Sequence, residues 1–349
     1  MHRPRLPRLA ALAAAAALLL GGCSTADPTD DSGGAPASSD AAFPVTIEHA
    51  HGSTTIESKP ERIVTLGWMA EDAVASLGVA PVGVPKNYSG ADGYSDWFSE
   101  YVTDELHAEL PEIIEVDGEG EFDIEQILTL EPDLILAPHS GMTEVQYERM
   151  SEIAPTVPYA KTPWFSAPWQ DFTRNVGLAM GEKELAETRI RETEQLIADA
   201  AADHPDLKGT DFIYGVTLWE GETELGVYVA DDPRVQFVHE FGLVDSPSLE
   251  AATAGTKEFT GGISLEKLDT LKTDVFIGWE GGAGRTEATL QNPLVSRWAP
   301  IARGSYYIMN DKGFAMATSA PTVLSIPWVL EQGFLDDLSS AVNGGAVIR

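Results

Sequence analysis

The sequence has little of several features that would point to other classes of protein. It has one cysteine among 349 residues, so no disulfide can form within the chain. Its 22 basic residues are outnumbered by 55 acidic ones, and a formal charge of −33 argues against binding to nucleic acid or to anionic lipid. Apolar residues make up 43% of the chain, enough for a real core, and the length suits two medium lobes.

The N-terminal residues have the pattern of an export signal. Three arginines precede an apolar run over 9–20, which is too short for a good membrane span. The run ends in Leu20-Gly21-Gly22-Cys23, and a lone thiol at this place resembles the bacterial lipobox, where cleavage leaves the cysteine lipidated. We therefore expect a signal peptide over 1–22 and a palmitate-type anchor on Cys23. The alternative is a secretory signal that happens to carry a cysteine.

A tether and a folded region are expected next. Residues 23–42 are rich in Ser, Asp, Ala and Gly and have no hydrophobic period, so they predict a disordered tether. Alternation over Val45–His49 and Thr54–Glu57 then predicts a hairpin. The β-branched runs that follow predict strands at Ile63–Leu66, Val82–Val84, Leu134–Ala137, Thr156–Tyr159, Phe212–Leu218, Val227–Val229, Val275–Trp279 and Tyr306–Met309. Helical patterns lie between them at Ala70–Leu77, Ile124–Leu130 and Leu265–Leu271. This alternation predicts an α/β fold with parallel sheets covered by helices on both faces.

An internal near-repeat suggests that one α/β unit is used twice. The segment IEQILTLEPDLILA (124–137) is matched by LEKLDTLKTDVFIG (265–278). Asp133 and Asp274 fall at the same place in the two segments, as do most apolar positions. Chance similarity between helix–strand patterns is the alternative.

One long helix is expected between the two halves. Residues 182–204 carry a roughly helical apolar stripe, and Pro205 ends it. The predicted architecture is therefore two Rossmann-like lobes joined by a single long helix, with a cleft between the lobes. We expect the N-terminal lobe over 43–165, a linking helical segment over 166–204 and the C-terminal lobe over 205–345.

Five segments in this order resemble the periplasmic-type binding proteins of iron–siderophore and vitamin B12 importers. They are Lys59–Val84, Phe122–Tyr159, Thr273–Trp279, Asn292–Met309 and Ala320–Gln332. The resemblance implies two lobes joined by one helix, a monomer held on the extracytoplasmic face of the cell membrane, and delivery of a ferric siderophore to the permease dimer of an ABC importer. We expect no catalysis, no resident cofactor and no contact with nucleic acid.

Ligands of open α/β sheets sit beyond the carboxyl ends of the strands, which selects candidate residues without any resemblance. Five of the eight tryptophans fall at or just beyond expected strand ends: Trp68, Trp164, Trp169, Trp219 and Trp279. Lys86, Asn87 and Tyr88 follow one strand, and His139 and Ser140 follow another. Some of the tryptophans could instead cap the cores of the lobes.

Aromatic walls suit a siderophore, because the chelator already wraps the iron and the protein meets a bulky organic shell. Arg234 and Arg285 are the candidates for exposed carbonyl or catecholate oxygens, although surface ion pairing explains Arg234 equally well. Tyr88, Tyr214 and Tyr228 are weaker candidates. Catecholate complexes need several cations, which are few here, so a neutral or cationic hydroxamate complex is favoured.

Other cargoes and an enzyme remain as alternatives. Haem would need an axial ligand such as His139, but a hydrogen-bonded loop histidine explains that residue better. A corrinoid is a further cargo of the same class. The seven histidines show no convergent metal-ligand set. The sequence has no nucleophile elbow, P-loop, HExxH or dinucleotide motif, so catalysis is the distant alternative.

Two glutamates are expected to dock the importer. Glu144 and Glu287 each follow a threonine just past a strand end, in near-equivalent places of the two halves. The resemblance implies one exposed glutamate on each lobe, meeting arginines on the two importer subunits. The alternative is that both carboxylates only favour the first turn of a helix.

Overall fold

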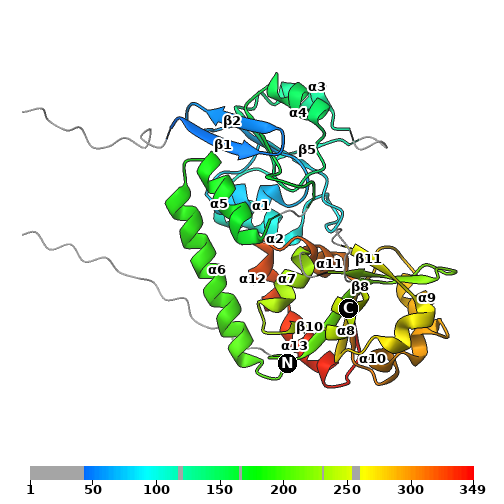
Figure 1. Ribbon diagram of the computed structural model, residues 1–349. Helices are drawn as coiled ribbons and strands as arrows, with labels where there is room; N and C mark the ends of the chain where they lie inside the picture. The colour runs from blue at the N-terminus through cyan, green and yellow to red at the C-terminus, as the bar shows by residue number, and fades with distance from the viewer. Residues whose placement is uncertain (1–42, 117–120, 165–166, 230–231, 254–259) are drawn as a thin grey trace, which may run out of the picture. The chain divides into compact units, whose positions relative to one another are not determined.

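The computed structural model describes residues 43–116, 121–164, 167–229, 232–253 and 260–349 (Figure 1). The predicted signal, Cys23 and the tether lie outside these residues. The described chain opens with the expected hairpin of β1 (Val45–His49) and β2 (Gly52–Ile56), whose strands pair antiparallel.

The first sheet has five strands, all paired parallel. They are β3 (Ile63–Thr65), β4 (Gly83–Pro85), β5 (Glu112–Ile114), β6 (Leu134–Ala137) and β7 (Thr156–Pro158), in the order β5-β4-β3-β6-β7. The helices of this part are α1 (Ala70–Ser76), α2 (Asp96–Glu100), the π-helix η2 (Tyr101–Glu105), α3 (Ile124–Thr129), α4 (Glu144–Ser151) and α5 (Trp169–Ala179). Phe172 and Val176 of α5 pack in one core with Leu134 and Leu136 of β6, so α5 covers this sheet.

The helix predicted over 182–204 is α6 (Lys183–Asp203), and it runs past both sheets (Figure 1). Its 21 residues make it roughly 31 Å long at about 1.5 Å per residue. Ala186 joins the core beneath the first sheet, while Ile190 and Ile197 join a second cluster that reaches the second sheet. One helix therefore packs into both halves of the molecule.

The second sheet has seven strands and is mixed, not parallel throughout as predicted. They are β8 (Asp211–Val216), β9 (Glu224–Tyr228), β10 (Val244–Asp245), β11 (Thr260–Ser264), β12 (Val275–Trp279), β13 (Tyr306–Met309) and β14 (Val347–Ile348). The main order is β11-β9-β8-β12-β13-β14, and β10 pairs with β8. β9 is antiparallel to both β8 and β11. The short turn after β8 brings the chain straight back, and a parallel crossover would need a dozen or more residues.

Helices flank this sheet as well. They are α7 (Pro233–His239), α8 (Pro247–Ala252), the 3-10 helix η3 (Leu265–Thr270), α9 (Arg285–Gln291), the 3-10 helix η4 (Val295–Arg297), α10 (Ala299–Ala302), α11 (Lys312–Ser319), α12 (Ser325–Glu331) and α13 (Phe334–Val342). The helix expected at Leu265–Leu271 is thus η3, a tighter 3-10 turn. β14 lies beyond the end expected for this lobe at residue 345.

The near-repeat occupies equivalent places in the two sheets. β6 lies between β3 and β7, and β12 lies between β8 and β13, with every pair parallel. The repeated aspartates, Asp133 and Asp274, both accept hydrogen bonds from the backbone of the neighbouring strand segment. Asp133 accepts hydrogen bonds from the backbone N–H groups of Glu61 and Arg62 at 2.7 and 2.8 Å, and Asp274 accepts one from Asp211 at 3.2 Å. Each carboxylate thereby ties its strand to the start of the neighbouring strand.

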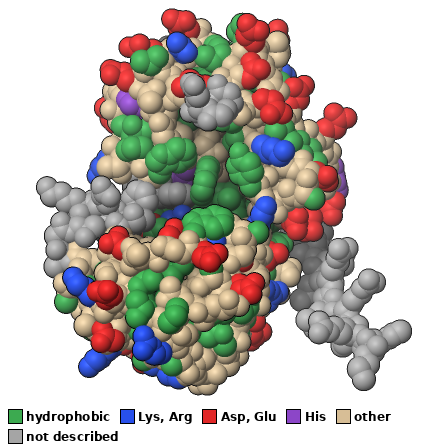
Figure 2. Space-filling view, turned by 90° about the vertical axis from the view of Figure 1, so that its right-hand side faces the viewer, with side chains coloured by type: hydrophobic (Ala, Val, Ile, Leu, Met, Phe, Trp, Pro, Cys, Tyr) green, Lys and Arg blue, Asp and Glu red, His purple; other side chains and the backbone are tan. Residues whose placement is uncertain are grey.

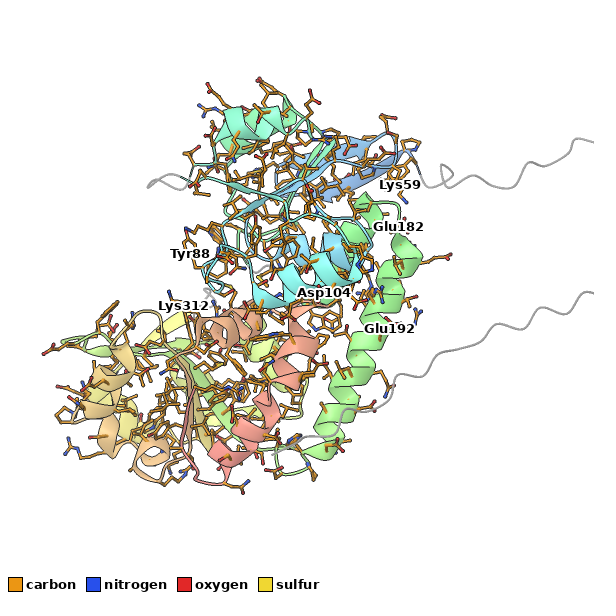
Figure 3. All side chains as sticks on the ribbon, turned by 180° about the vertical axis from the view of Figure 1, so that it is seen from behind. Lys59, Tyr88, Asp104, Glu182, Glu192 and Lys312 are labelled. Carbon is orange, nitrogen blue, oxygen red and sulfur yellow. The ribbon has the colours of Figure 1, made fainter. Side chains whose placement is uncertain are left out.

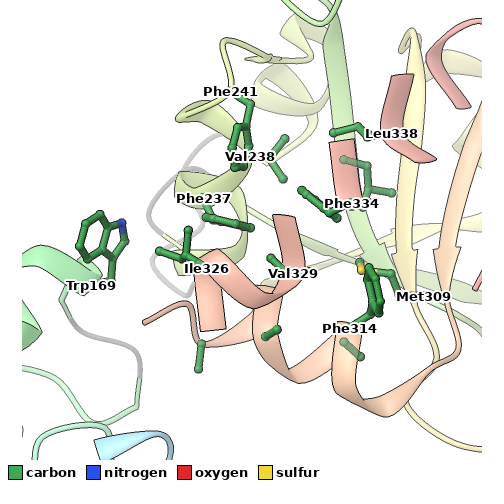
Figure 4. Packing of buried hydrophobic residues seen from close by; sticks show 14 of the residues in the cluster. Trp169, Phe237, Val238, Phe241, Met309, Phe314, Ile326, Val329, Phe334 and Leu338 are labelled. Atoms are coloured by element: carbon green, nitrogen blue, oxygen red, sulfur yellow. The ribbon is translucent and has the colours of Figure 1, made fainter. Parts of the chain in front are cut away.

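One hydrophobic cluster draws on both halves of the chain. Met69, Trp97 and Phe98 share it with residues of α7, α12 and α13, several of which are drawn in Figure 4. Trp97 on α2 packs on Trp328 of α12, with ring centroids 4.9 Å apart. A polar link runs beside this contact: Asp72 of α1 accepts hydrogen bonds from Trp97 Nε1 at 2.8 Å and from Thr322 Oγ1 at 2.6 Å.

Candidate functional site

Two adjoining cavities open where the strands of both sheets end. The first, of about 340 Å³, is lined by the segments after β3, β4 and β6, by Trp164 and by Met316 of α11. The second, of about 710 Å³, is lined by residues 279–284 at the end of β12 and by Lys312, Ala315, Met316 and Ser319 of α11. Trp68, Tyr88 and Met316 line both cavities, so we treat them as one cleft. Figure 2 shows a hollow walled by hydrophobic side chains, and Figure 3 shows Tyr88 and Lys312 on its two sides. Volumes of this order suit a small-molecule site.

The turn after β3 fixes Trp68 in the cleft. Gly67 has φ 88°, and a Cβ there would lie 2.4 Å from the carbonyl oxygen of His139, so only glycine fits. The next residue, Trp68, donates its backbone N–H to that same oxygen at 3.0 Å. The turns after β3 and β6 are thus locked together, and the indole of Trp68 is held at the junction of the two cavities.

Trp164 completes the aromatic wall of the first cavity. It is 43% exposed, and its ring meets that of Trp68 edge to face with centroids 6.3 Å apart. Its backbone N–H donates to Ser140 O at 2.9 Å, and its ring lies over Gly141, where a Cβ would come within 2.5 Å of the indole. Edge-to-face aromatic pairs of this kind offer a rigid apolar surface to a ligand.

The second cavity is backed by a stacked set of side chains. Trp279 lines it and donates from Nε1 to the hydroxyl of Tyr228 at 2.9 Å. The guanidinium of Arg234 lies over the ring of Tyr228, 4.2 Å from its centroid, and pairs with Asp232 at 2.9 Å. Tyr228 and Arg234 therefore lie behind the residues that line this cavity. Arg234 contacts the lining through Ser319, whose hydroxyl accepts from its Nε at 3.2 Å.

Trp219 and Arg285 support the glycine-rich loop of the second cavity. The guanidinium of Arg285 lies 4.8 Å from the Trp219 ring centroid and donates from Nε to Thr217 O at 2.5 Å. Trp219 is 49% exposed and lies against Gly282, where a Cβ would be 2.8 Å from the indole. Neither side chain lines the cleft itself; both hold the loop that does.

Two predicted ligand residues, His139 and Trp169, lie in the interior. The ring of His139 is buried and stacks on Phe172 with centroids 4.3 Å apart, and this burial lowers its pKa to about 4. Trp169 is 3% exposed, and its Nε1 donates to Glu240 Oε1 at 2.9 Å. Trp169 is the first residue of helix α5, and its side chain packs in the hydrophobic cluster shared by both halves. It therefore does not reach the cleft, although it lies near an expected strand end. Tyr214 is likewise buried, with its hydroxyl 3.4 Å from that of Thr318.

Several lining residues were missed by the strand-end rule. Met316, Lys312 and Ser319 come from a helix that follows β13, and Glu121 comes from a loop segment before α3. Glu71 is the second residue of α1. Their only signal in the sequence is proximity to expected strands, which many other residues share.

The cleft has few charged groups. Among the lining side chains that the structure describes, Lys86 and Lys312 are the bases and no arginine is present. Glu280 uses both carboxylate oxygens to cap α9, accepting from Arg285 N at 3.1 Å and from Thr286 Oγ1 at 2.9 Å. Burial, reinforced by the neighbouring carboxyl of Asp72, raises the pKa of Glu71. The lining is therefore mostly apolar and aromatic, and it contains few polar or charged side chains.

The two predicted docking residues are exposed in the first turns of their helices. Glu144 opens α4, whose N-cap Thr143 forms a capping box with Gln146. Glu287 lies in the first turn of α9 and accepts from Gln291 Nε2 at 2.8 Å. Their positions fit both a docking role and favourable helix termini.

No described group of three or more His, Cys, Asp or Glu side chains could hold a metal ion. Within the same described ranges, no helix combines the length and apolar character needed to cross a membrane.

A cleft between two α/β halves joined by one long helix defines a solute-binding protein. The family model described as periplasmic binding protein matches residues 63–309, and the chain belongs to this family. The family and its structural neighbours are substrate-binding proteins, so the chain is a binding protein and not an enzyme.

Known relatives and structures agree with this assignment. The chain is 24% identical to the Fe(3+)-citrate-binding protein YfmC of Bacillus subtilis over 292 residues, which cover 83% of this chain and 84% of the relative. It is 29% identical to the Fe(3+) dicitrate-binding periplasmic protein FecB of Escherichia coli over 227 residues, 65% and 69% of the two chains. PiaA of Streptococcus pneumoniae, solved in complex with ferrichrome, superimposes with a TM-score of 0.76 at 28% identity, covering 86% of this chain and 99% of PiaA.

Proposed function

We propose that the protein captures a ferric siderophore of the hydroxamate type in its cleft, outside the cytoplasm, and delivers it to an ABC importer. The observation that carries this proposal is the junction of the two cavities at Trp68, Tyr88 and Met316. A chelated iron needs no ligand from the protein, and its organic shell is matched by aromatic faces with a few orienting polar groups.

The charge of the lining favours a hydroxamate over a catecholate complex. A strongly anionic catecholate complex calls for several cations, whereas the described lining offers Lys86 and Lys312. Arg234 and Arg285 are already engaged, with Asp232 and with Thr217 and Glu222 respectively. That PiaA is solved with ferrichrome, a hydroxamate complex, supports the same choice.

Ferric citrate is the second candidate ligand. Two relatives are named for citrate complexes of iron, and such complexes are anionic. Lys86 on one side of the cleft and Lys312 on the other could receive their carboxylates. Haem is less well supported, because the histidine expected as its axial ligand, His139, is buried against Phe172. Cobalamin remains a further cargo of the same class.

Anchoring and docking complete the proposed function. Cys23 would carry the lipid that holds the protein, as a monomer, at the outer face of the membrane. Glu144 and Glu287 would meet the two permease subunits, and such rim charges steer and orient association more than they add affinity.

Calorimetric titration with a panel of ligands tests the proposal. The panel contains ferrichrome, a ferric catecholate, ferric citrate, haem and cobalamin. We expect the tightest binding for ferrichrome, no turnover of any ligand, and quenching of tryptophan fluorescence. Preference for ferric citrate that disappears in Lys86→Met or Lys312→Met would favour the second candidate. Binding of haem or cobalamin alone would refute the iron-siderophore assignment.

A further inference from the structure

Glu71 is an unusual member of the cleft wall. It lines the first cavity although its side chain is only 4% exposed. Its Oε2 atom has no hydrogen-bond partner among the residues that the structure describes. Buried polar atoms are almost always paired, and an exception in a binding site calls for an explanation. The terminal torsion of a glutamate side chain is soft, so either carboxyl oxygen can be turned toward the cavity.

The surroundings of Glu71 determine its protonation state. Burial also raises the pKa of Asp72, next to it on α1, to about 7. Hydrogen bonds that Asp72 accepts from Trp97 on α2 and from Thr322 ahead of α12 oppose this rise, because they favour the charged form of Asp72. Burial and the charge of Asp72 raise the pKa of Glu71 to about 8. A proton shared by this pair therefore resides on Glu71, which makes it an O–H donor at neutral pH.

Other elements around α1 bring little charge to this carboxyl. On the cavity wall, the charged groups are Lys86 after β4 and Glu121 before α3. Helix α5 packs on α1 through apolar residues such as Phe172. Helix α11 contributes Met316 to the same cavity. Asp72 is the neighbouring charge that affects the protonation of Glu71.

We propose that the carboxyl group of Glu71 is a specificity-determining hydrogen-bond donor that recognises an acceptor oxygen on the outer shell of a neutral iron complex. The inference rests on the proposed function and adds a chemical requirement to it. A ligand with a carbonyl or hydroxamate oxygen at this place gains a partner, and Glu71 gains one for its unpaired oxygen. When Glu71 ionises, its carboxylate repels the same oxygen, so affinity falls as the pH rises through the pKa of this group.

The test is the pH dependence of the Kd for ferrichrome between about pH 6 and about pH 9.5. In the wild type, affinity should be level up to about pH 8 and then fall, by at most roughly tenfold per pH unit. Glu71→Gln keeps a donor and cannot ionise, so its affinity should stay within about threefold of wild type at pH 6 and remain level. Glu71→Met has no donor and should bind about 5- to 30-fold more weakly at every pH.

Glu240→Gln is the matched control. Burial raises the pKa of Glu240 too, but its carboxylate holds Trp169 and does not line the cleft, so the alkaline fall should persist in this variant. A level wild-type profile, or a fall that survives in Glu71→Gln, would overturn the inference alone. Affinity that rises with pH would also overturn it, because the partner would then be a cation. If no iron complex binds to the folded protein, the proposed function fails and the inference falls with it.

Discussion

Replacing Trp68 with alanine should show whether this tryptophan contributes to ligand binding or to the stability of the fold. Trp68 lines both cavities, whereas a buried tryptophan such as Trp169 supports the fold. If a ligand covers about 50 to 100 Å² of the Trp68 ring, burial at about 25 cal/mol per Å² contributes about 1.2 to 2.5 kcal/mol. The Kd for ferrichrome should therefore rise by about 8- to 60-fold in Trp68→Ala, since about 1.4 kcal/mol is a factor of ten.

The matched variant is Trp169→Ala. It removes a side chain that is 3% exposed and leaves Glu240 without its indole donor, so the free energy of unfolding should fall by about 3 to 5 kcal/mol. The folded fraction should still bind ferrichrome with nearly wild-type affinity. Calorimetric titration and thermal unfolding measure the two effects. The reasoning is refuted if Trp68→Ala lowers the melting temperature as much as Trp169→Ala does and leaves the Kd unchanged.

Three further predictions concern stability, docking and anchoring. Burial raises the pKa of Glu71 and Asp72 above their unfolded values, so the folded state binds more protons and stability should decline from about pH 4 to about pH 8. Thermal unfolding of the Glu71→Gln, Asp72→Asn double variant should show a smaller decline; an unaltered slope would contradict the assignment. Glu144→Ala with Glu287→Ala should leave the Kd for ferrichrome near normal but lower iron uptake by cells, and normal uptake would reduce both residues to helix-terminal acids. Cys23→Ala should release the protein from the membrane fraction with its affinity intact, and unchanged membrane association would refute the lipid anchor.

The buried parallel strands were the most predictable elements. Leu134–Ala137, Val275–Trp279 and Tyr306–Met309 have the predicted bounds, because a strand buried on both faces is a continuous apolar run. Four strands were not predicted: β5, β10, β11 and β14. β10 and β14 have two residues each, too few for a pattern. β5 contains Glu112 and β11 contains two glycines, so neither of these edge strands carries a hydrophobic run. The antiparallel pairing in the second sheet was not predicted either. Strand direction depends on which strands pair, and the composition of a strand does not reveal that.

The candidate site was predictable only where a strand end and the cavity coincide. Trp68 and Trp279 line the cleft because β3 and β12 end at it. Trp169 also lies near an expected strand end, but the chain turns there into α5 and buries the indole. Met316 reaches the cleft from a helix face, which a rule about strand ends cannot find. Packing between segments that are distant in the sequence decides which side chains near a strand end face the ligand.

The hydrophobic cluster that draws on both halves also bears on how the molecule unfolds. Trp97 and Phe98 from the first half share this cluster with Phe334 and Leu338 from the second, and α6 contributes to it as well. Each half also has apolar clusters of its own, but separating the halves would expose the shared side chains to water, and this cost couples the two halves. The chain should therefore melt in a single cooperative transition, with equal calorimetric and van't Hoff enthalpies. A ligand bound in the cleft would then protect the chain as a whole and raise one melting temperature, including that of segments far from the site.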